Sequence, residues 1–139
     1  MDTIYPDPSI EIKYQDDYKR TTFFKRISEF KENPIGYNKV VFLGNSITNG
    51  LRRHFSKLNR SDIVNRGIDG DISLGILERL DELIYYKPKA VFILIGLNDF
   101  FNDLTKMPEV TPEFVTKNII KAANKIKRGS PKTKIYLQT

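Results

Sequence analysis

Residues 40–50 of the chain read VVFLGNSITNG and carry the clearest indication of the fold. A short run of β-branched and aromatic residues leads directly into a glycine, an asparagine and a serine. Near-continuous apolar runs of this kind are typical of strands buried on both faces of a parallel sheet. Gly44 and Ser46 therefore follow the carboxyl end of a predicted strand, which is where open α/β sheets bind their ligands.

The rest of the chain alternates between predicted strands and helices. After an irregular lead-in over residues 1–15, strands are expected at 39–43, 62–65, 90–95 and 134–138, and helices at 16–31, 48–58, 72–86 and 111–128. The helical segments are recognised by apolar residues that recur every three or four positions. Alternation with short connections indicates an α/β fold, in which right-handed βαβ units surround a parallel sheet.

Composition limits the classes of function. The 139 residues suffice for one domain, and 40% hydrophobic with 29% charged residues is an ordinary globular composition. The net charge of +6 comes from basic residues dispersed along the chain, which favours a solvated surface over a nucleic-acid site. Because the chain has no cysteine and only one histidine, His54, we expect no disulfide, metal site or cofactor.

The sequence also bears on location. Its first residues, MDTIYPDPSIEIK, have neither the basic nor the apolar region of a signal peptide. The longest apolar run, Ala90 to Ile95, is far too short to span a bilayer. These features predict a cytoplasmic protein without a membrane partner.

Three predicted strands end in residues that suit ester chemistry. Ser46 follows the first strand, Gly67 the second and Asn98 the third. Acyl transfer needs a nucleophile and hydrogen-bond donors that face the developing oxyanion. A serine, a glycine N–H and an asparagine amide at one edge of a sheet would supply both.

Other interpretations of Ser46 remain open at this point. A phosphate-binding loop has four residues between its glycines, followed by lysine and serine or threonine, whereas here five separate Gly44 from Gly50 and Leu51 follows. An α/β-hydrolase elbow would need a glycine where Thr48 stands. A plain turn, with Ser46 or Thr48 capping a helix, is the third alternative.

Taken together, three segments resemble the sequence blocks of the SGNH hydrolases, also called GDSL-type esterases and lipases. VFLGNSIT is similar to their first block, NRGIDGD to the second and LIGLNDF to the third, with wording closest to bacterial acylhydrolases and platelet-activating-factor acetylhydrolase-like proteins. The resemblance implies a three-layer α/β/α, flavodoxin-like parallel sheet. It also implies Ser46 as nucleophile and an oxyanion hole from the N–H groups of Ser46 and Gly67 and the side-chain amide of Asn98. The implied substrates are small acyl esters, O-acetyl esters of carbohydrate among them.

The chain departs from this family pattern in two places. Asn45 replaces the usual aspartate before the serine, and the C-terminal Asp-x-x-His block, which supplies the general base, is absent. His54 lies eight residues beyond Ser46, roughly 12 Å along a helix, so we do not expect it to serve as the base. We therefore expect residues 1–38 to form a lead-in and helix, and residues 39–139 to form the N-terminal part of a C-terminally incomplete hydrolase domain.

An exposed last strand over residues 134–138 is expected to promote self-association.

Three functions follow from these observations. The first is an SGNH-type esterase, which as this chain alone would be nearly inactive. The second is a non-catalytic binding module that keeps the family's surface. The third is a flavodoxin-like binder of nucleotide or phosphate.

Overall fold

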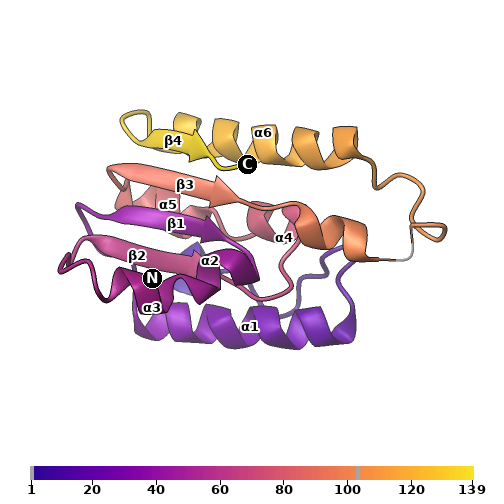
Figure 1. The fold of residues 1–139 in the computed structure, drawn as a ribbon, viewed down its shortest axis with the longest axis horizontal. Coiled ribbons are helices and arrows are strands. Elements are labelled where there is room, and N and C mark those ends of the chain that lie inside the picture. Colours follow the sequence, from indigo (N-terminus) through magenta and orange to yellow (C-terminus); the bar gives the residue numbers. More distant parts are fainter. Residues whose placement is uncertain (1, 103) are drawn as a thin grey trace.

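The computed structural model describes residues 2–102 and 104–139 and contains one four-stranded parallel sheet (Figure 1). Its strands are β1 (Val40–Gly44), β2 (Ile63–Gly67), β3 (Ala90–Leu94) and β4 (Lys134–Leu137). They lie in the order β2-β1-β3-β4, and each neighbouring pair is parallel. The parallel strands and the helices that connect them confirm the predicted α/β fold.

Helices connect the strands and precede the first one. They are η1 (Asp2–Ile4), α1 (Asp17–Glu32), α2 (Ser46–Gly50), α3 (Arg52–Phe55), α4 (Ser73–Leu77), α5 (Asp81–Tyr86), η2 (Leu97–Phe101) and α6 (Pro112–Gly129). The two long helices begin at caps, where Asp16 accepts from the Lys19 N–H and Thr111 accepts from the Phe114 N–H. In the described residues, no helix has the length and apolarity that crossing a membrane requires.

Two predicted helices are each divided in the structure. The segment expected at 48–58 begins earlier, at Ser46, because Asn45 caps it, and it is divided at Leu51 into α2 and α3. The segment expected at 72–86 forms α4 and α5. The interruption includes Arg79, whose buried side chain bonds to Asp71 and to backbone carbonyls, and such tertiary contacts leave no mark on a hydrophobic pattern.

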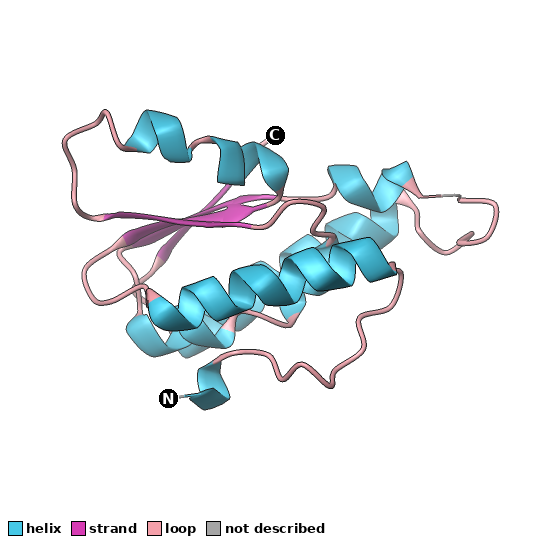
Figure 2. Cartoon of the chain, turned by 90° about the horizontal axis from the view of Figure 1, so that it is seen from below, coloured by secondary structure: helices cyan, strands magenta, loops and turns pink. Residues whose placement is uncertain are grey.

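The helices cover the two faces of the sheet unequally. Seen from below, α2 and α3 lie on one side of the strands, and the longer helices lie on the other (Figure 2). The well-covered face holds the main core, in which residues of β1 and β3 pack against α4, α5 and α6. Its fully buried members include Val41, Leu43, Val91, Ile76, Leu80, Leu83 and Ile126. The helices on both faces agree with the predicted three layers.

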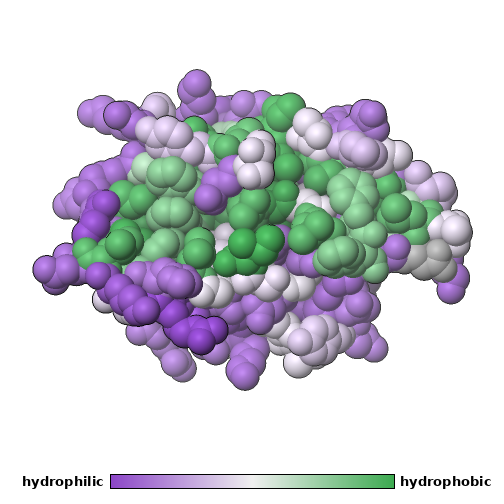
Figure 3. All heavy atoms as spheres, in the orientation of Figure 1, coloured by the Kyte–Doolittle hydropathy of each residue, from purple (hydrophilic) through white to green (hydrophobic). Residues whose placement is uncertain are grey.

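The opposite face carries an aromatic row that crosses the sheet. Phe42 stacks on Phe92, and Phe92 stacks on Tyr136, with ring centroids 4.7 Å apart in both pairs. Phe55 of α3 covers the Phe42 end of this row, with ring centroids 4.6 Å apart. Tyr136, in the edge strand β4, remains 46% exposed. Figure 3 shows hydrophobic surface running across this side of the molecule.

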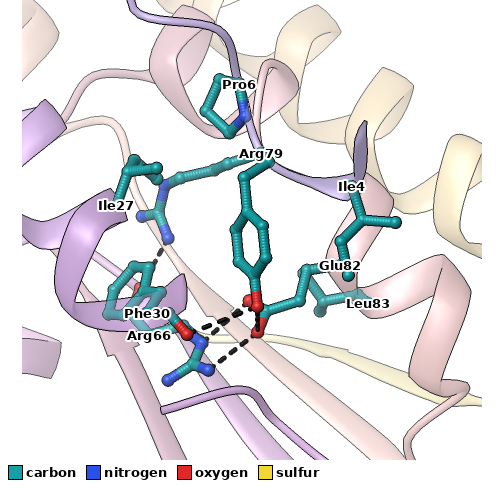
Figure 4. Close-up of a pocket in the computed structure, with 9 residues that line it drawn as sticks. Ile4, Pro6, Ile27, Phe30, Arg66, Arg79, Glu82 and Leu83 are labelled. Atoms are coloured by element: carbon teal, nitrogen blue, oxygen red, sulfur yellow. Dashed lines mark hydrogen bonds and ion pairs between the residues drawn. The ribbon is translucent and has the colours of Figure 1, made fainter. Parts of the chain in front are cut away.

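A buried ion pair joins the N-terminal segment to the sheet (Figure 4). Arg66 donates from Nε and Nη2 to the two carboxylate oxygens of Glu82, at 2.9 and 2.8 Å. Glu82 also accepts from the Tyr5 hydroxyl and from the Ile35 N–H, at 3.0 and 3.1 Å. The cavity beside them measures about 10 Å³, enough for one water at most, so the cluster has a structural role.

Candidate active site

Ser46 is the first residue of α2, immediately after the carboxyl end of β1. Asn45 caps this helix: its Oδ1 accepts from the Ile47 N–H at 3.0 Å, and the residue is only 1% exposed. Ser46 itself is exposed to solvent. A buried cap thus holds a short helix whose first side chain is a hydroxyl that faces outward.

Gly44 is required for space at this strand end. A Cβ atom there would lie 2.3 Å from Thr48 Oγ1 and 2.5 Å from the Leu94 carbonyl oxygen. The φ angle of Gly44 is not positive, so the glycine is not needed for an unusual turn. Its absent side chain lets α2 and the end of β3 approach β1 closely.

Replacing Gly44 by alanine is expected to destabilise the protein, because the new methyl group must displace backbone that cannot move freely. Overpacking of this kind costs about 1–3 kcal/mol. Gly50 is the matched control, since a Cβ there meets no atom within 4 Å and its φ is not positive. Urea unfolding should show a lower midpoint for Gly44→Ala and an unchanged or higher midpoint for Gly50→Ala. Equal midpoints for the two variants would contradict the close approach.

Gly67 ends β2 and lies opposite Gly44 in the register. A Cβ there would lie 2.3 Å from the backbone nitrogen of Asn49, so α2 packs directly on this glycine. Its N–H donates to Asn65 Oδ1 at 2.8 Å. The structure therefore differs from the sequence-based expectation: Gly67 stands at the expected strand end, but an internal acceptor already engages its N–H.

Gly70 lies in the turn that follows. The Asp71 N–H bonds to the Ile68 carbonyl at 3.1 Å, and Gly70 has the positive φ of 77° that a glycine in such a turn adopts readily. Within the described part of the chain, the N–H of Gly70 has no hydrogen-bond acceptor. Gly70 is not among the site residues expected from the sequence, although it is the second glycine of NRGIDGD.

The same turn is tied to the other two strand ends. Asn49 of α2 donates its side-chain amide to Asp69 Oδ1 at 2.8 Å. Asn98, in η2 after β3, donates Nδ2 to the Asp71 carbonyl at 3.0 Å. One hydrogen of that amide remains for another acceptor, because an NH₂ group donates twice. The turn around Gly70 thus lies between α2 and the Asn98 amide.

Asp99 anchors the segment that carries Asn98. Its carboxylate accepts from the Ser73 backbone N–H at 3.0 Å and from the Ser73 hydroxyl at 2.7 Å, which caps α4 from a distant part of the chain. Asn118 of α6 donates to the same hydroxyl at 3.0 Å. Burial raises the pKa of Asp99, and the bonds from Ser73 oppose that rise. The sequence pattern does not indicate this network, since its members are far apart along the chain.

His54 lies on a different helix from Ser46. This histidine is exposed on α3, and its side chain makes no hydrogen bond within residues 2–102 and 104–139. No group of three His, Asp or Glu side chains in those residues is placed to hold a metal ion. The groups found at these strand ends are a hydroxyl, backbone N–H groups and one side-chain amide.

Comparisons with known proteins agree with this architecture. Residues 42–139 match the sequence model of the GDSL-like Lipase/Acylhydrolase family. Comparison with curated proteins gives no match.

Solved structures resemble the chain along most of its length. A GDSL-like lipase from Bacteroides thetaiotaomicron is 27% identical, with a TM-score of 0.61 over 83% of this chain and 56% of its own. A protein described as a GDSL-like lipase from Parabacteroides merdae is 25% identical, with a TM-score of 0.56 over 75% and 61%. A Streptococcus pneumonia protein described as a platelet activating factor shares the fold at 24% identity and a TM-score of 0.65, over 84% and 52%. The chain thus spans about half to three-fifths of the length of these structures.

Proposed function

The chain belongs to the GDSL-like lipase/acylhydrolase family, and we propose that it has the site of an ester hydrolase whose nucleophile is Ser46. The observation that supports this best is the position of Ser46, exposed at the start of α2 beside the turn that binds Asn98. In the proposed reaction, Ser46 Oγ bonds to the acyl carbon and the carbonyl electrons move to its oxygen. Collapse of that adduct breaks the bond to the alkoxy oxygen, which takes up the proton lost by Ser46 and leaves as the alcohol. Water then hydrolyses the acylated serine and regenerates its hydroxyl.

The oxyanion of the adduct would be stabilised by three donors in this proposal. They are the Ser46 N–H, the second hydrogen of Asn98 Nδ2 and the N–H of Gly70, which replaces the engaged N–H of Gly67. Donors already held in place by the fold need little reorganisation during the reaction, which is why such sites accelerate acyl transfer. We extend the proposal to small acyl esters, O-acetyl esters of carbohydrate among them, because the resemblance of the three sequence blocks implies such substrates.

The hydroxyl proton must pass to a general base, and we propose that this chain by itself lacks one. The only histidine, His54, is exposed on a different helix from Ser46. The same observation favours the second candidate function, a non-catalytic module that binds an acylated ligand without turnover. The two functions differ in whether Ser46 is chemically activated.

Reaction with a fluorophosphonate probe tests the proposed function. Because the oxyanion donors act even without a general base, we expect slow labelling: at high probe concentration, intact-mass spectrometry should show one adduct on the wild-type chain, at Ser46, and none on Ser46→Ala. The control is Ser56→Ala, which removes another exposed serine, on the C-terminal side of α3, and should keep the adduct. A wild-type chain that stays unlabelled at high probe concentration would favour the binding module.

A further inference from the structure

We propose that Arg79 is a positioning residue that aligns the strand ends which carry the candidate site. This inference rests on the proposed function, because alignment matters only if Ser46 and Asn98 act on one substrate. Arg79 lies between α4 and α5, and its side chain is buried. It would act through backbone and through Asp71, without touching substrate.

The guanidinium of Arg79 bonds to two strand ends at once. Nη2 donates to the Gly44 carbonyl at 2.9 Å, and Nη1 donates to the Arg66 carbonyl at 2.7 Å. These carbonyls belong to the last residue of β1 and to the penultimate residue of β2. The first lies two residues before Ser46, and the second precedes the turn at Gly70. Arg79 therefore fixes the spacing between the end of β1, which leads into Ser46, and the end of β2, which leads into the turn at Gly70.

Asp71 extends this connection to the third strand end. Its Oδ2 accepts from Arg79 Nε and Nη2 at 2.9 and 2.8 Å, while its Oδ1 accepts from the Ile72 N–H at 3.0 Å. A Cβ atom on Gly75 would lie 1.9 Å from Oδ1, so the carboxylate is packed against the first turns of α4. The backbone carbonyl of Asp71 is the acceptor for Asn98 Nδ2. One aspartate thus joins the guanidinium to the candidate oxyanion donor.

The contacts require an arginine. Its planar fork supplies donors in three directions, whereas a lysine is a compact charge that cannot reach two carbonyls and a carboxylate together. The side chains of Arg79 and Asp71 are almost fully buried, 4% and 0% exposed respectively. Burial raises the pKa of Asp71, and the charge of Arg79 opposes that rise. A buried pair of this kind adds little stability relative to a well-packed apolar pair, so stability alone does not account for its geometry.

The second buried arginine supplies a matched control. Arg66 is 5% exposed and pairs with Glu82 in a similar bidentate geometry. Its side chain bonds to Glu82 and to backbone carbonyls of Asn33 and Asn65, and to no residue of the Gly44, Gly70 or Asn98 segments. Lysine in place of either arginine should cost comparable stability, but only the change at Arg79 should disturb the site.

The test compares Arg79→Lys with Arg66→Lys in the full chain, at a temperature where circular dichroism shows both variants folded. Two rates are measured: fluorophosphonate labelling of Ser46, and hydrogen exchange of the Asn98 side-chain amide followed by NMR. For Arg79→Lys we expect labelling to slow by about tenfold to a hundredfold, since displacements of about 1 Å have effects of that size. The Asn98 amide should exchange about tenfold faster or more. Arg66→Lys should keep both rates within about twofold of wild type.

Unchanged rates in Arg79→Lys would overturn the inference, and so would equal losses in the two variants, which would indicate general destabilisation. If the wild-type chain is not labelled at all, the proposed function fails, but the exchange rates of the Asn98 amide still decide whether Arg79 holds it. If Arg79→Lys does not fold, Asp71→Asn provides the second variant. It keeps the backbone carbonyl that binds Asn98 and, in Oδ1, an acceptor for the Ile72 N–H, but it replaces the oxygen that accepts from Arg79. The same two rates with the same outcomes apply.

Discussion

The Ser46→Ala variant of this chain is expected to hydrolyse p-nitrophenyl acetate no faster than buffer does. The wild-type chain should exceed that background only slightly, because it would hold a nucleophile and oxyanion donors without a general base. In serine hydrolases that lose a member of the catalytic triad, the oxyanion hole and binding leave about 10³–10⁴-fold catalysis over water. The complete set of triad residues contributes roughly 10⁶ in turnover. Steady-state hydrolysis, with protein concentration varied, measures both rates.

The control variants are His54→Ala and Ser56→Ala, in which an exposed side chain of the α3 region is removed. Both should match the wild-type rate. Turnover on the order of 1 s⁻¹ or faster that is lost in Ser46→Ala and in His54→Ala would identify His54 as the base and would contradict our proposal. Turnover of that size lost in Ser46→Ala alone would indicate a base that we have not identified.

The second large effect is expected at Glu82. Replacing it by leucine leaves the buried Arg66 guanidinium without its carboxylate, and it also removes the acceptor of Tyr5 and Ile35. Breaking a buried pair from one side costs about 3–5 kcal/mol. For a chain of this size the melting temperature should fall by roughly 6–20 °C. Urea unfolding and calorimetry measure the loss.

A double variant separates the unpaired charge from the lost packing. Arg66→Leu combined with Glu82→Leu should be less destabilised than the sum of the single variants, by about 0.5–3 kcal/mol, because no buried charge is then unpaired. Asp81→Asn is the surface control. Its partner Lys125 lies 3.2 Å away in a pair that is largely exposed, so the change should stay within about 1 kcal/mol. A Glu82 effect no larger than the Asp81 effect would contradict the structural role of the cluster.

The sheet was predictable from sequence because its strands are short apolar runs in an alternating pattern. The predicted strand at 90–95 is observed as β3, Ala90–Leu94, and the predicted strand at 39–43 as β1, Val40–Gly44. Ser46 and Asn98 could be placed at strand ends for the same reason, since parallel strands bring their carboxyl ends to one edge. The long helices α1 and α6 were likewise indicated by their caps and periodic apolar residues.

The polar contacts behind the site were not predictable. Nothing in the sequence singles out Arg79, yet it is buried because Asp71 and two carbonyls satisfy its donors. Gly67 was assigned an oxyanion role that depends on a free N–H, and only the structure shows Asn65 folding back to bond to it. Each contact depends on side-chain directions in three dimensions, which a pattern of residue types along the chain does not contain.

The strand register has a consequence for how the chain reaches its native state. Val40 pairs with Ile63 on one side and with Ala90 on the other, and Ala90 pairs in turn with Lys134. Every pairing is parallel, so no two strands can associate through a tight hairpin, and each ladder must first close a long loop. Sheets built in this way have high contact order and acquire their pairings slowly. During synthesis on a ribosome, the second edge of β1 stays unpaired until β3 has emerged.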